Sequence, residues 1–202
     1  MTTLREGNQQ MQGLRERKKA RTRAAIQRHA LRLFQEQGYE ATTVEQIAEA
    51  AEVSPSTFFR YFPTKEDVVL YDDLDPILFA AFEAQPAELT PVQAMRRALR
   101  QGFASLPAEE IEQQWERGRL ILRVPELRMH MLDQLVEALK ESAGLIARRV
   151  GRRADDFAVS TYAGAIIGAL LAAMLTGAND PKADFIELMD ASLAYLEAGL
   201  PL

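Results

Sequence analysis

Residues 42–65, TTVEQIAEAAEVSPSTFFRYFPTK, contain the start signals of two short helices joined by a tight turn. Thr43 is followed three residues later by Gln46, which completes a capping box for the first helix. Ser54 can cap the second helix, and Pro55 suits its first position because the N–H that proline lacks would be unpaired there. The segment therefore predicts a helix-turn-helix.

The apolar residues of this segment share one side of the two helices: Val44, Ile47, Ala48, Ala51, Val53, Phe58 and Phe62. The residues left on the other side of the second helix are Ser56, Thr57, Phe59, Arg60 and Tyr61. A DNA-binding helix-turn-helix needs this division, because one side packs and the other enters the major groove. A plain helical hairpin with a solvent-facing surface is the alternative.

The flanking residues extend the pattern on both sides. Residues 14–40, LRERKKARTRAAIQRHALRLFQEQGYE, begin with basic residues and continue as an amphipathic helix. Gly38 suits the C-terminal cap of that helix. Thr64 can cap a further helix, with the acidic Glu66 and Asp67 in its first turn. We expect this later helix to continue through residue 84, with a bend at Pro76.

Residues 20–70 resemble the DNA-binding domain of TetR-family transcriptional regulators. The matching segments are FQEQGYEATTV (34–44), QIAEAAEVS (46–54), PSTFFRYF (55–62) and FPTKEDVV (62–69). One departure is Glu52, which occupies a turn position where such motifs often carry glycine. If its backbone is left-handed, Glu52 adds strain of about 1 kcal/mol. The resemblance implies a DNA-binding regulator, commonly a repressor, that acts as a homodimer on a palindromic operator.

The resemblance also implies which side chains contact DNA. Those at the recognition helix are Pro55, Ser56, Thr57, Phe59, Arg60 and Tyr61. Arg60 can bind guanine with two hydrogen bonds, and Thr57 or Phe59 can contact a thymine methyl group. The alternative for Phe59 and Tyr61 is packing within the domain. Residues placed to hold the phosphate backbone are Tyr61, Thr43, Lys65, Arg21 and Arg23.

Charge is distributed unevenly along the chain. The whole protein carries a formal charge of −5, which by itself argues against nucleic acid. Residues 1–65 hold eleven basic and seven acidic side chains, so they carry about +4 and the remainder about −9. We expect a flexible basic arm at residues 1–17, a DNA-binding domain at 18–65 and a helical regulatory and dimerisation domain at 66–202. The polar N-terminus has no apolar secretion signal, which indicates the cytoplasm.

The rest of the chain predicts helices and no strand, which makes an all-α protein of about nine helices. Helix starts are indicated at Thr90-Pro91, after Pro107, at Pro125, at Asp155-Asp156 and at Pro181. The chain has no cysteine, its two histidines have no ligand-spaced partners, and it shows no phosphate loop or nucleophile motif. We expect no enzyme activity, no metal and no cofactor.

Residues 157–179, FAVSTYAGAIIGALLAAMLTGAN, carry no charge and include a G-x-x-x-G motif. Such a segment can cross a membrane, which would make the protein a membrane-associated sensor. It can also be a helix that protein buries on every side. By resemblance we favour a dimerisation helix and expect no membrane. The small residues that would allow close approach of a second copy are Ala163, Gly164, Ala165, Gly168 and Ala172.

The resemblance further implies a cavity for a small-molecule effector within the second domain. Candidate lining residues are Phe79, Phe82, Phe103, Trp115, Arg119, Arg123, Met129, Leu132 and Met174, although at helical spacing most also fit a plain core. Arg119 and Arg123 lie one turn apart and can meet an anionic group, or form a surface salt-bridge face. A hydrophobic or amphipathic molecule is the expected class. A helical interaction module whose basic domain binds a protein or an anionic membrane remains an alternative to the DNA-binding regulator.

Overall fold

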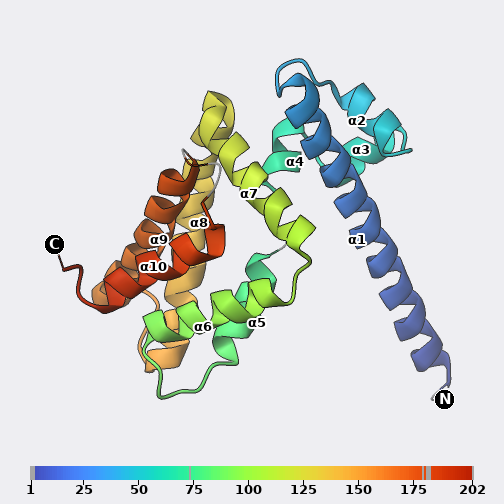
Figure 1. Cartoon of the computed structure of the whole chain (residues 1–202). Coiled ribbons are helices and arrows are strands. Elements are labelled where there is room, and N and C mark those ends of the chain that lie inside the picture. The colour runs from blue at the N-terminus through green and yellow to red at the C-terminus, as the bar shows by residue number, and fades with distance from the viewer. Residues whose placement is uncertain (1–2, 73, 179, 181–182, 202) are drawn as a thin grey trace. The chain divides into compact units, whose positions relative to one another are not determined.

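The computed structural model describes residues 3–72, 74–178, 180 and 183–201, and for residues 3–14 it describes the backbone alone. Across these residues it contains ten helices and no strand (Figure 1). The predicted all-α fold is therefore confirmed. The chain divides into two compact units, Met1–Tyr71 and Asp72–Leu202. The first unit therefore includes residues 66–71, which the sequence analysis placed in the second domain.

The first unit consists of α1 (Thr3–Gln37), α2 (Val44–Ala50), α3 (Pro55–Tyr61) and α4 (Lys65–Leu70). α1 contacts α2 and α4, and α2 contacts α3. Their shared core contains these side chains, each at most 3% exposed: Ile26, Ala30, Phe34, Ile47, Ala48, Phe58, Phe62, Val68 and Val69. Residues 3–17, where the sequence predicted a flexible arm, belong to the helix α1. Leucine, glutamine, arginine and glutamate in this stretch favour a helix more than Gly7 and Gly13 oppose it.

The predicted helix from Thr64 through residue 84 is wrong, because it is two helices. α4 ends at Leu70, and α5 (Asp75–Glu83) follows after a short connection. The amide of Gln27 on α1 donates to the carbonyls of Val68 and Tyr71, at 2.9 and 2.8 Å, which holds the end of α4. Pro76 has no N–H to donate to a preceding turn, so a helix running on through this region would lose a backbone hydrogen bond.

The second unit continues with α6 (Pro91–Ala104), α7 (Ala108–Arg123), α8 (Pro125–Val150), α9 (Phe157–Ala178) and α10 (Phe185–Glu197). The predicted starts at Pro91 and Pro125 are confirmed. The start expected at Pro181 lies outside the described residues. α10 instead begins after Asp184, whose side chain accepts the N–H of Glu187 at 3.0 Å.

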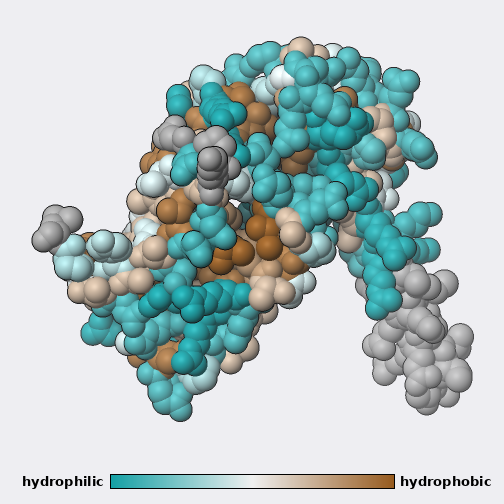
Figure 2. Space-filling view, viewed as in Figure 1, coloured by the Kyte–Doolittle hydropathy of each residue, from teal (hydrophilic) through white to brown (hydrophobic). Residues whose placement is uncertain are grey.

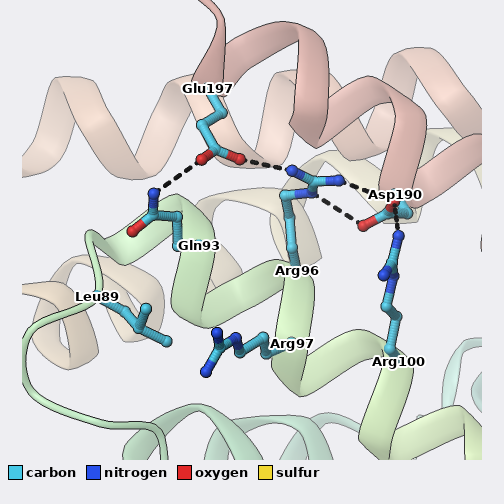
Figure 3. A pocket seen from close by; sticks show the side chains of 7 residues that line it. All are labelled: Leu89, Gln93, Arg96, Arg97, Arg100, Asp190 and Glu197. Atoms are coloured by element: carbon cyan, nitrogen blue, oxygen red, sulfur yellow. Dashed lines mark hydrogen bonds and ion pairs between the residues drawn. The ribbon is translucent and has the colours of Figure 1, made fainter.

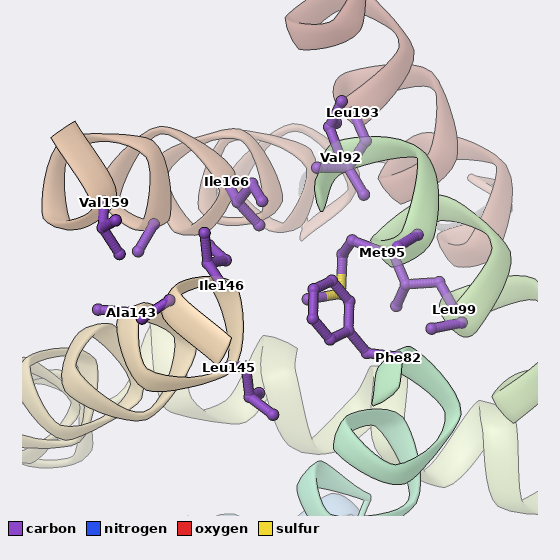
Figure 4. Close-up of a cluster of buried hydrophobic side chains, with 14 of the residues drawn as sticks. Phe82, Val92, Met95, Leu99, Ala143, Leu145, Ile146, Val159, Ile166 and Leu193 are labelled. Atoms are coloured by element: carbon purple, nitrogen blue, oxygen red, sulfur yellow. The ribbon is translucent and has the colours of Figure 1, made fainter. Parts of the chain in front are cut away.

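The core of the second unit combines side chains from α5, α6, α8, α9 and α10 (Figure 4). Its labelled members in that view are Phe82, Val92, Met95, Leu99, Ala143, Leu145, Ile146, Val159, Ile166 and Leu193. On the face shown in Figure 2 the first unit is mostly hydrophilic, whereas hydrophobic patches open on the second unit. The second unit therefore leaves apolar surface outside its own core.

Candidate nucleic-acid interface

Local signals fix the start and the buried side of α3. The Ser54 hydroxyl accepts the N–H of Thr57 at 3.1 Å, and Pro55 occupies the first turn. Phe58 and Phe62 are 0% and 2% exposed, and their ring centroids lie 6.0 Å apart. Burial of these two rings sets the rotation of the helix about its axis, so the residues between them must face outward.

The outward side of α3 carries the predicted DNA contacts. Pro55, Ser56 and Arg60 are exposed, whereas Thr57 and Tyr61 are partly buried. The Phe59 side chain is 51% exposed, although its ring meets Phe58 edge-on at 5.4 Å. This helix therefore presents hydroxyl groups, one exposed aromatic ring and one cation on a single face, which is the chemistry that base edges and phosphates can accept.

Arg23 contacts other side chains of the first unit, which the sequence alone does not indicate. Its guanidinium carbon lies 4.7 Å from the Tyr71 ring centroid and 5.9 Å from that of Tyr61. It also donates to the Tyr71 hydroxyl at 3.2 Å, while its buried Nε has no hydrogen-bond partner. Arg21, by contrast, is exposed. Arg23 thus holds two tyrosines in place at the same time as it presents positive charge.

The polar groups of Lys65 and Thr43 also form hydrogen bonds within the first unit. The Lys65 ammonium group donates to the carbonyls of Tyr39 and Thr42, at 3.0 and 3.3 Å, and lies 4.1 Å from the Tyr39 ring centroid. Since an ammonium has three donors, one remains for a phosphate. The Thr43 hydroxyl accepts the N–H of Gln46 at 3.3 Å, which leaves its own proton free to donate. Sequence patterns missed the role of Tyr39 and of Gln27, because their partners are distant in the chain.

The turn between α2 and α3 contains the expected left-handed residue. Glu52 has a φ of 55°, so its backbone is left-handed, the condition under which a residue other than glycine is expected to add strain. The N–H of Val53 then donates to the carbonyl of Ala48 at 2.9 Å, which closes the turn.

The ligand-pocket candidates do not come together as one set. Phe82 and Phe103 belong to the buried core, and Phe79 packs against it. Arg123 is exposed, and Met129 and Leu132 are 79% and 64% exposed on α8.

Three candidates do share the contact between α7 and α9. Trp115 is 3% exposed and stacks on Phe185 at 4.6 Å, with the Arg119 guanidinium carbon 4.9 Å from its ring centroid. Met174 of α9 lies against Gly118 of α7. Trp115 Nε1 and Arg119 Nε are buried without a hydrogen-bond partner.

The small-residue candidates of α9 split between two sides of the helix. Ala163 is fully buried in the core of its own chain, so its assignment to a dimer face is wrong. It lies on the side of Val159 and Ile166, at helical spacing from both. The other four candidates, Gly164, Ala165, Gly168 and Ala172, are all exposed. We call these four residues the α9 stripe.

The α9 stripe continues toward both ends of the helix with large apolar side chains. Phe157 is 84% exposed and Leu175 is 48% exposed. By length and composition α9 could cross a membrane. Its most apolar 18 residues have a mean hydropathy of 1.9, and only 22% of that stretch is buried. One such helix is weak evidence for a membrane span, because core helices of soluble proteins can be equally long and apolar. An apolar, largely uncovered helix of this kind needs a partner.

Comparison with known proteins matches both units of the chain. Residues 26–71 match the family described as "Bacterial regulatory proteins, tetR family", and residues 89–201 match the "MftR C-terminal domain". The HTH-type transcriptional regulator TcmR of Streptomyces glaucescens is 44% identical over 151 residues, which cover 71% of this chain and 67% of that protein.

Two further comparisons extend over most of the chain. MftR of Mycobacterium tuberculosis, named as a mycofactocin biosynthesis transcriptional regulator, is 27% identical over 187 residues, covering 91% of this chain and 93% of that one. The crystal structure of Thermus thermophilus FadR, a TetR-family repressor in complex with lauroyl-CoA, matches with a TM-score of 0.56 and 26% identity. That match covers 89% of this chain and 95% of FadR.

Proposed function

This chain belongs to the TetR family of DNA-binding transcriptional regulators and is not an enzyme. From that premise we propose that it is a cytoplasmic repressor that binds a palindromic operator as a homodimer and leaves it when a small hydrophobic or amphipathic molecule binds. The observation that supports this proposal most strongly is the outward side of α3, where Phe59 and Arg60 are exposed on a helix that Ser54 caps.

In this proposal α3 reads base edges in the major groove. Arg60 is the side chain that binds guanine, because its guanidinium can donate two parallel hydrogen bonds to O6 and N7. Thr57 and Phe59 contact a thymine methyl group, which favours apolar surface. Tyr61 donates to a phosphate, and its ring is already held near the guanidinium carbons of Arg60 and Arg23 at 5.4 and 5.9 Å.

Phosphate contacts then fix the register of α3 on the duplex. Arg21, Arg23, Lys65 and the hydroxyl of Thr43 are the groups we assign to this role, and Pro55 and Ser56 lie at the helix end that favours anions. These contacts carry no sequence information, so removing one should weaken binding to all duplexes about equally.

The second copy would pack on the α9 stripe. Its small residues allow two helices to approach closely, and the exposed Phe157 and Leu175 would be buried in the same contact. A symmetric pair of DNA-binding units would match two half-sites about one helical turn or more apart. The lauroyl-CoA complex of FadR supports the amphipathic class of effector, since that related repressor holds such a molecule.

Selection from a pool of random duplexes tests the DNA-binding proposal. We expect one palindrome to be enriched and to bind roughly 10³-fold or more tightly than random DNA at physiological salt. Because the proposed dimer carries two copies of Arg60, Arg60→Ala should weaken binding to that palindrome by about 1–3 kcal/mol for each half-site and relax the preference at one base pair of each half-site. Arg32→Ala is the matched control, because it removes an equally charged, exposed side chain of the same unit that is paired with Glu36.

Two results would contradict the proposal. One is a pool with no enriched sequence, which would favour a helical module that binds a protein or an anionic membrane. The other is an equal loss of affinity for Arg60→Ala and Arg32→Ala, which would mean that α3 does not read bases.

The dimer is tested separately by Gly168→Leu. A Cβ at Gly168 would meet nothing within 4 Å in the chain itself, so the new side chain starts in open space, and circular dichroism should show the variant folded like the wild type. Sedimentation should show a wild-type dimer without detergent and a weaker dimer for the variant. An unchanged dimer, or a wild-type chain that needs detergent to stay in solution, would refute the assignment of the α9 stripe.

A further inference from the structure

An open groove lies between α6 and α10 in the second unit (Figure 3). Its volume is about 290 Å³. The residues that line it are Leu89, Gln93, Arg96, Arg97, Arg100, Asp190 and Glu197. It contains none of the ligand-pocket candidates predicted from the sequence, and three of its seven lining residues are arginines.

Two of these arginines are used to hold α10 against α6. Arg96 donates to both carboxylate oxygens of Asp190, at 2.9 and 3.0 Å, and to Glu197 at 2.6 Å. Arg100 donates to Asp190 at 2.6 Å. The hydrogen bonds from Arg96 and then Arg100 lower the pKa of Asp190, so this carboxylate is ionised at neutral pH. Both carboxylates of the groove thus already have cationic partners.

Arg97 is the cation that remains. It follows Arg96 directly, so it projects about 100° further around α6 and away from the two carboxylates. Figure 3 shows its guanidinium pointing along the groove toward Leu89. Among the described residues Arg97 forms no ion pair or hydrogen bond, and it is exposed. Three arginines against two carboxylates leave the groove with one net positive charge, located beside an apolar side chain.

We propose that this groove binds a small amphipathic anion. The carboxylate or phosphate of the ligand pairs with Arg97, and its apolar part lies on Leu89. Its volume of about 290 Å³ leaves room for a small organic acid and not only for a single inorganic ion. An arginine suits this role because its planar fork can donate two hydrogen bonds to a carboxylate or phosphate.

The position of the groove gives such a ligand a route to regulation. α10 packs on α9, where the Ser192 hydroxyl donates to the Ala169 carbonyl at 2.6 Å. Arg96 and Arg100, which tie α10 to α6 through Asp190, belong to the wall of the same groove, so a ligand bound there can shift α10. A shift of α10 would thereby reach the helix that carries the α9 stripe. The regulatory role of this ligand rests on the proposed function, whereas its binding to the groove does not.

A neighbouring hollow of about 420 Å³ differs from this groove in an important respect. Its wall includes Ala165 of the α9 stripe, together with Val92 and Tyr162. A second copy packed on the stripe would cover that hollow. The groove at Arg97 has no residue of the stripe in its wall, although it shares Gln93 and Glu197 with that hollow.

The test compares octanoate, octyl phosphate and octanol on the full chain without DNA. Calorimetry gives the affinity, and Trp115 fluorescence reports on α10, because this only tryptophan of the chain stacks on Phe185 of that helix. We expect one or both anions to bind at least tenfold more tightly than octanol. Arg97→Gln should lower the affinity for the anion about five- to tenfold, and Arg97→Lys should retain part of that affinity. If only one anion binds, it identifies the head group of the ligand.

Arg152→Gln is the matched control, since Arg152 is an exposed arginine of the same unit that does not line the groove. It should leave the affinity unchanged, and circular dichroism should show all variants equally folded. Binding of neither anion, equal binding of octanol, or an unaffected Arg97→Gln variant would overturn the proposal. A loss confined to Arg152→Gln would place the anion outside the groove. None of these readings involves operator DNA, so they leave the DNA-binding proposal standing or falling on its own experiment.

Discussion

Replacing Gly177 with alanine should destabilise the second unit, because the new methyl group has no room. Gly177 is next to the last residue of α9, where this helix crosses Trp115. A Cβ at this position would lie 2.6 Å from Trp115 Cζ2 and 2.7 Å from Leu188 Cδ1. Contacts below 3.0 Å are essentially never seen for real Cβ atoms. Trp115 is 3% exposed and stacked on Phe185, so it has no free space to move into.

The expected size follows from two opposing effects. Overpacking a buried site of this kind costs about 1–3 kcal/mol. Alanine in place of glycine in a helix returns about 0.5–1 kcal/mol, and the gain is at the low end near a helix terminus. We therefore expect a net loss of about 1–2 kcal/mol in the free energy of unfolding. For a chain of this size that corresponds to a fall in Tm of roughly 2–8 °C.

Gly102→Ala is the matched control for this prediction. Gly102 also lies near the end of its helix, α6, and a Cβ there would meet nothing within 4 Å. This variant should be about 0.5 kcal/mol more stable than the wild type, since only the helix effect remains and Gly102 also lies near a helix terminus. Urea unfolding by circular dichroism, at one fixed protein concentration because dimerisation adds to stability, measures both. A Gly177→Ala midpoint at or above that of the wild type would refute the reasoning.

Three further predictions follow from single contacts. Glu52→Gly should raise the free energy of unfolding by about 0.5–1 kcal/mol, because it relieves the left-handed φ of 55°, and a lower urea midpoint would contradict this. Ser54→Ala should cost about 1 kcal/mol and weaken operator binding, because the N–H of Thr57 loses its 3.1 Å acceptor. Ser56→Ala is the control for stability, because the Ser56 hydroxyl contacts that of Ser54 at 2.9 Å but does not accept the Thr57 N–H, and an equal stability loss in both would show that the cap is not responsible. Partial burial and then the charge of Asp72 raise the pKa of Asp75 to about 6, so the folded state binds more protons than the unfolded state between about pH 4 and 6, and its stability falls as pH rises through that range. Asp75→Asn should therefore stabilise the chain at pH 7.5 but hardly at pH 4, and a gain that is independent of pH would contradict this cause.

The helix starts were predictable because their signals are local. Thr43, Ser54, Thr64 and Thr90 each accept the N–H three residues later. The break after α4 was not predictable in this way, because it depends on Gln27, which lies 41 and 44 residues before the carbonyls it binds. No pattern within residues 64–84 contains that contact.

The two sides of α9 were likewise hidden from the sequence. The helix is apolar almost all round, so its hydrophobic periodicity does not distinguish Ala163, which is buried, from Gly164, which is exposed. The pocket candidates failed to gather for the same reason, since Met129 and Phe82 carry equally apolar side chains but differ in which helix lies beside them. Sequence reasoning also passed over Arg97, because the ion pairs that leave it alone join α6 to α10 across 94 and 101 residues.

By itself the sequence determined the all-α fold, the caps of the helix-turn-helix and the residues that face outward from α3. These features depend on hydrogen bonds and apolar spacing within a few residues along the chain, which a linear sequence displays directly. Only the tertiary structure decided which side of α9 is exposed and which arginine of α6 remains unpaired. It also decided that Lys65 donates two hydrogen bonds to carbonyls of the loop before α2. Those outcomes depend on burial and ion pairing between residues that are distant in the chain, and folding alone brings them together.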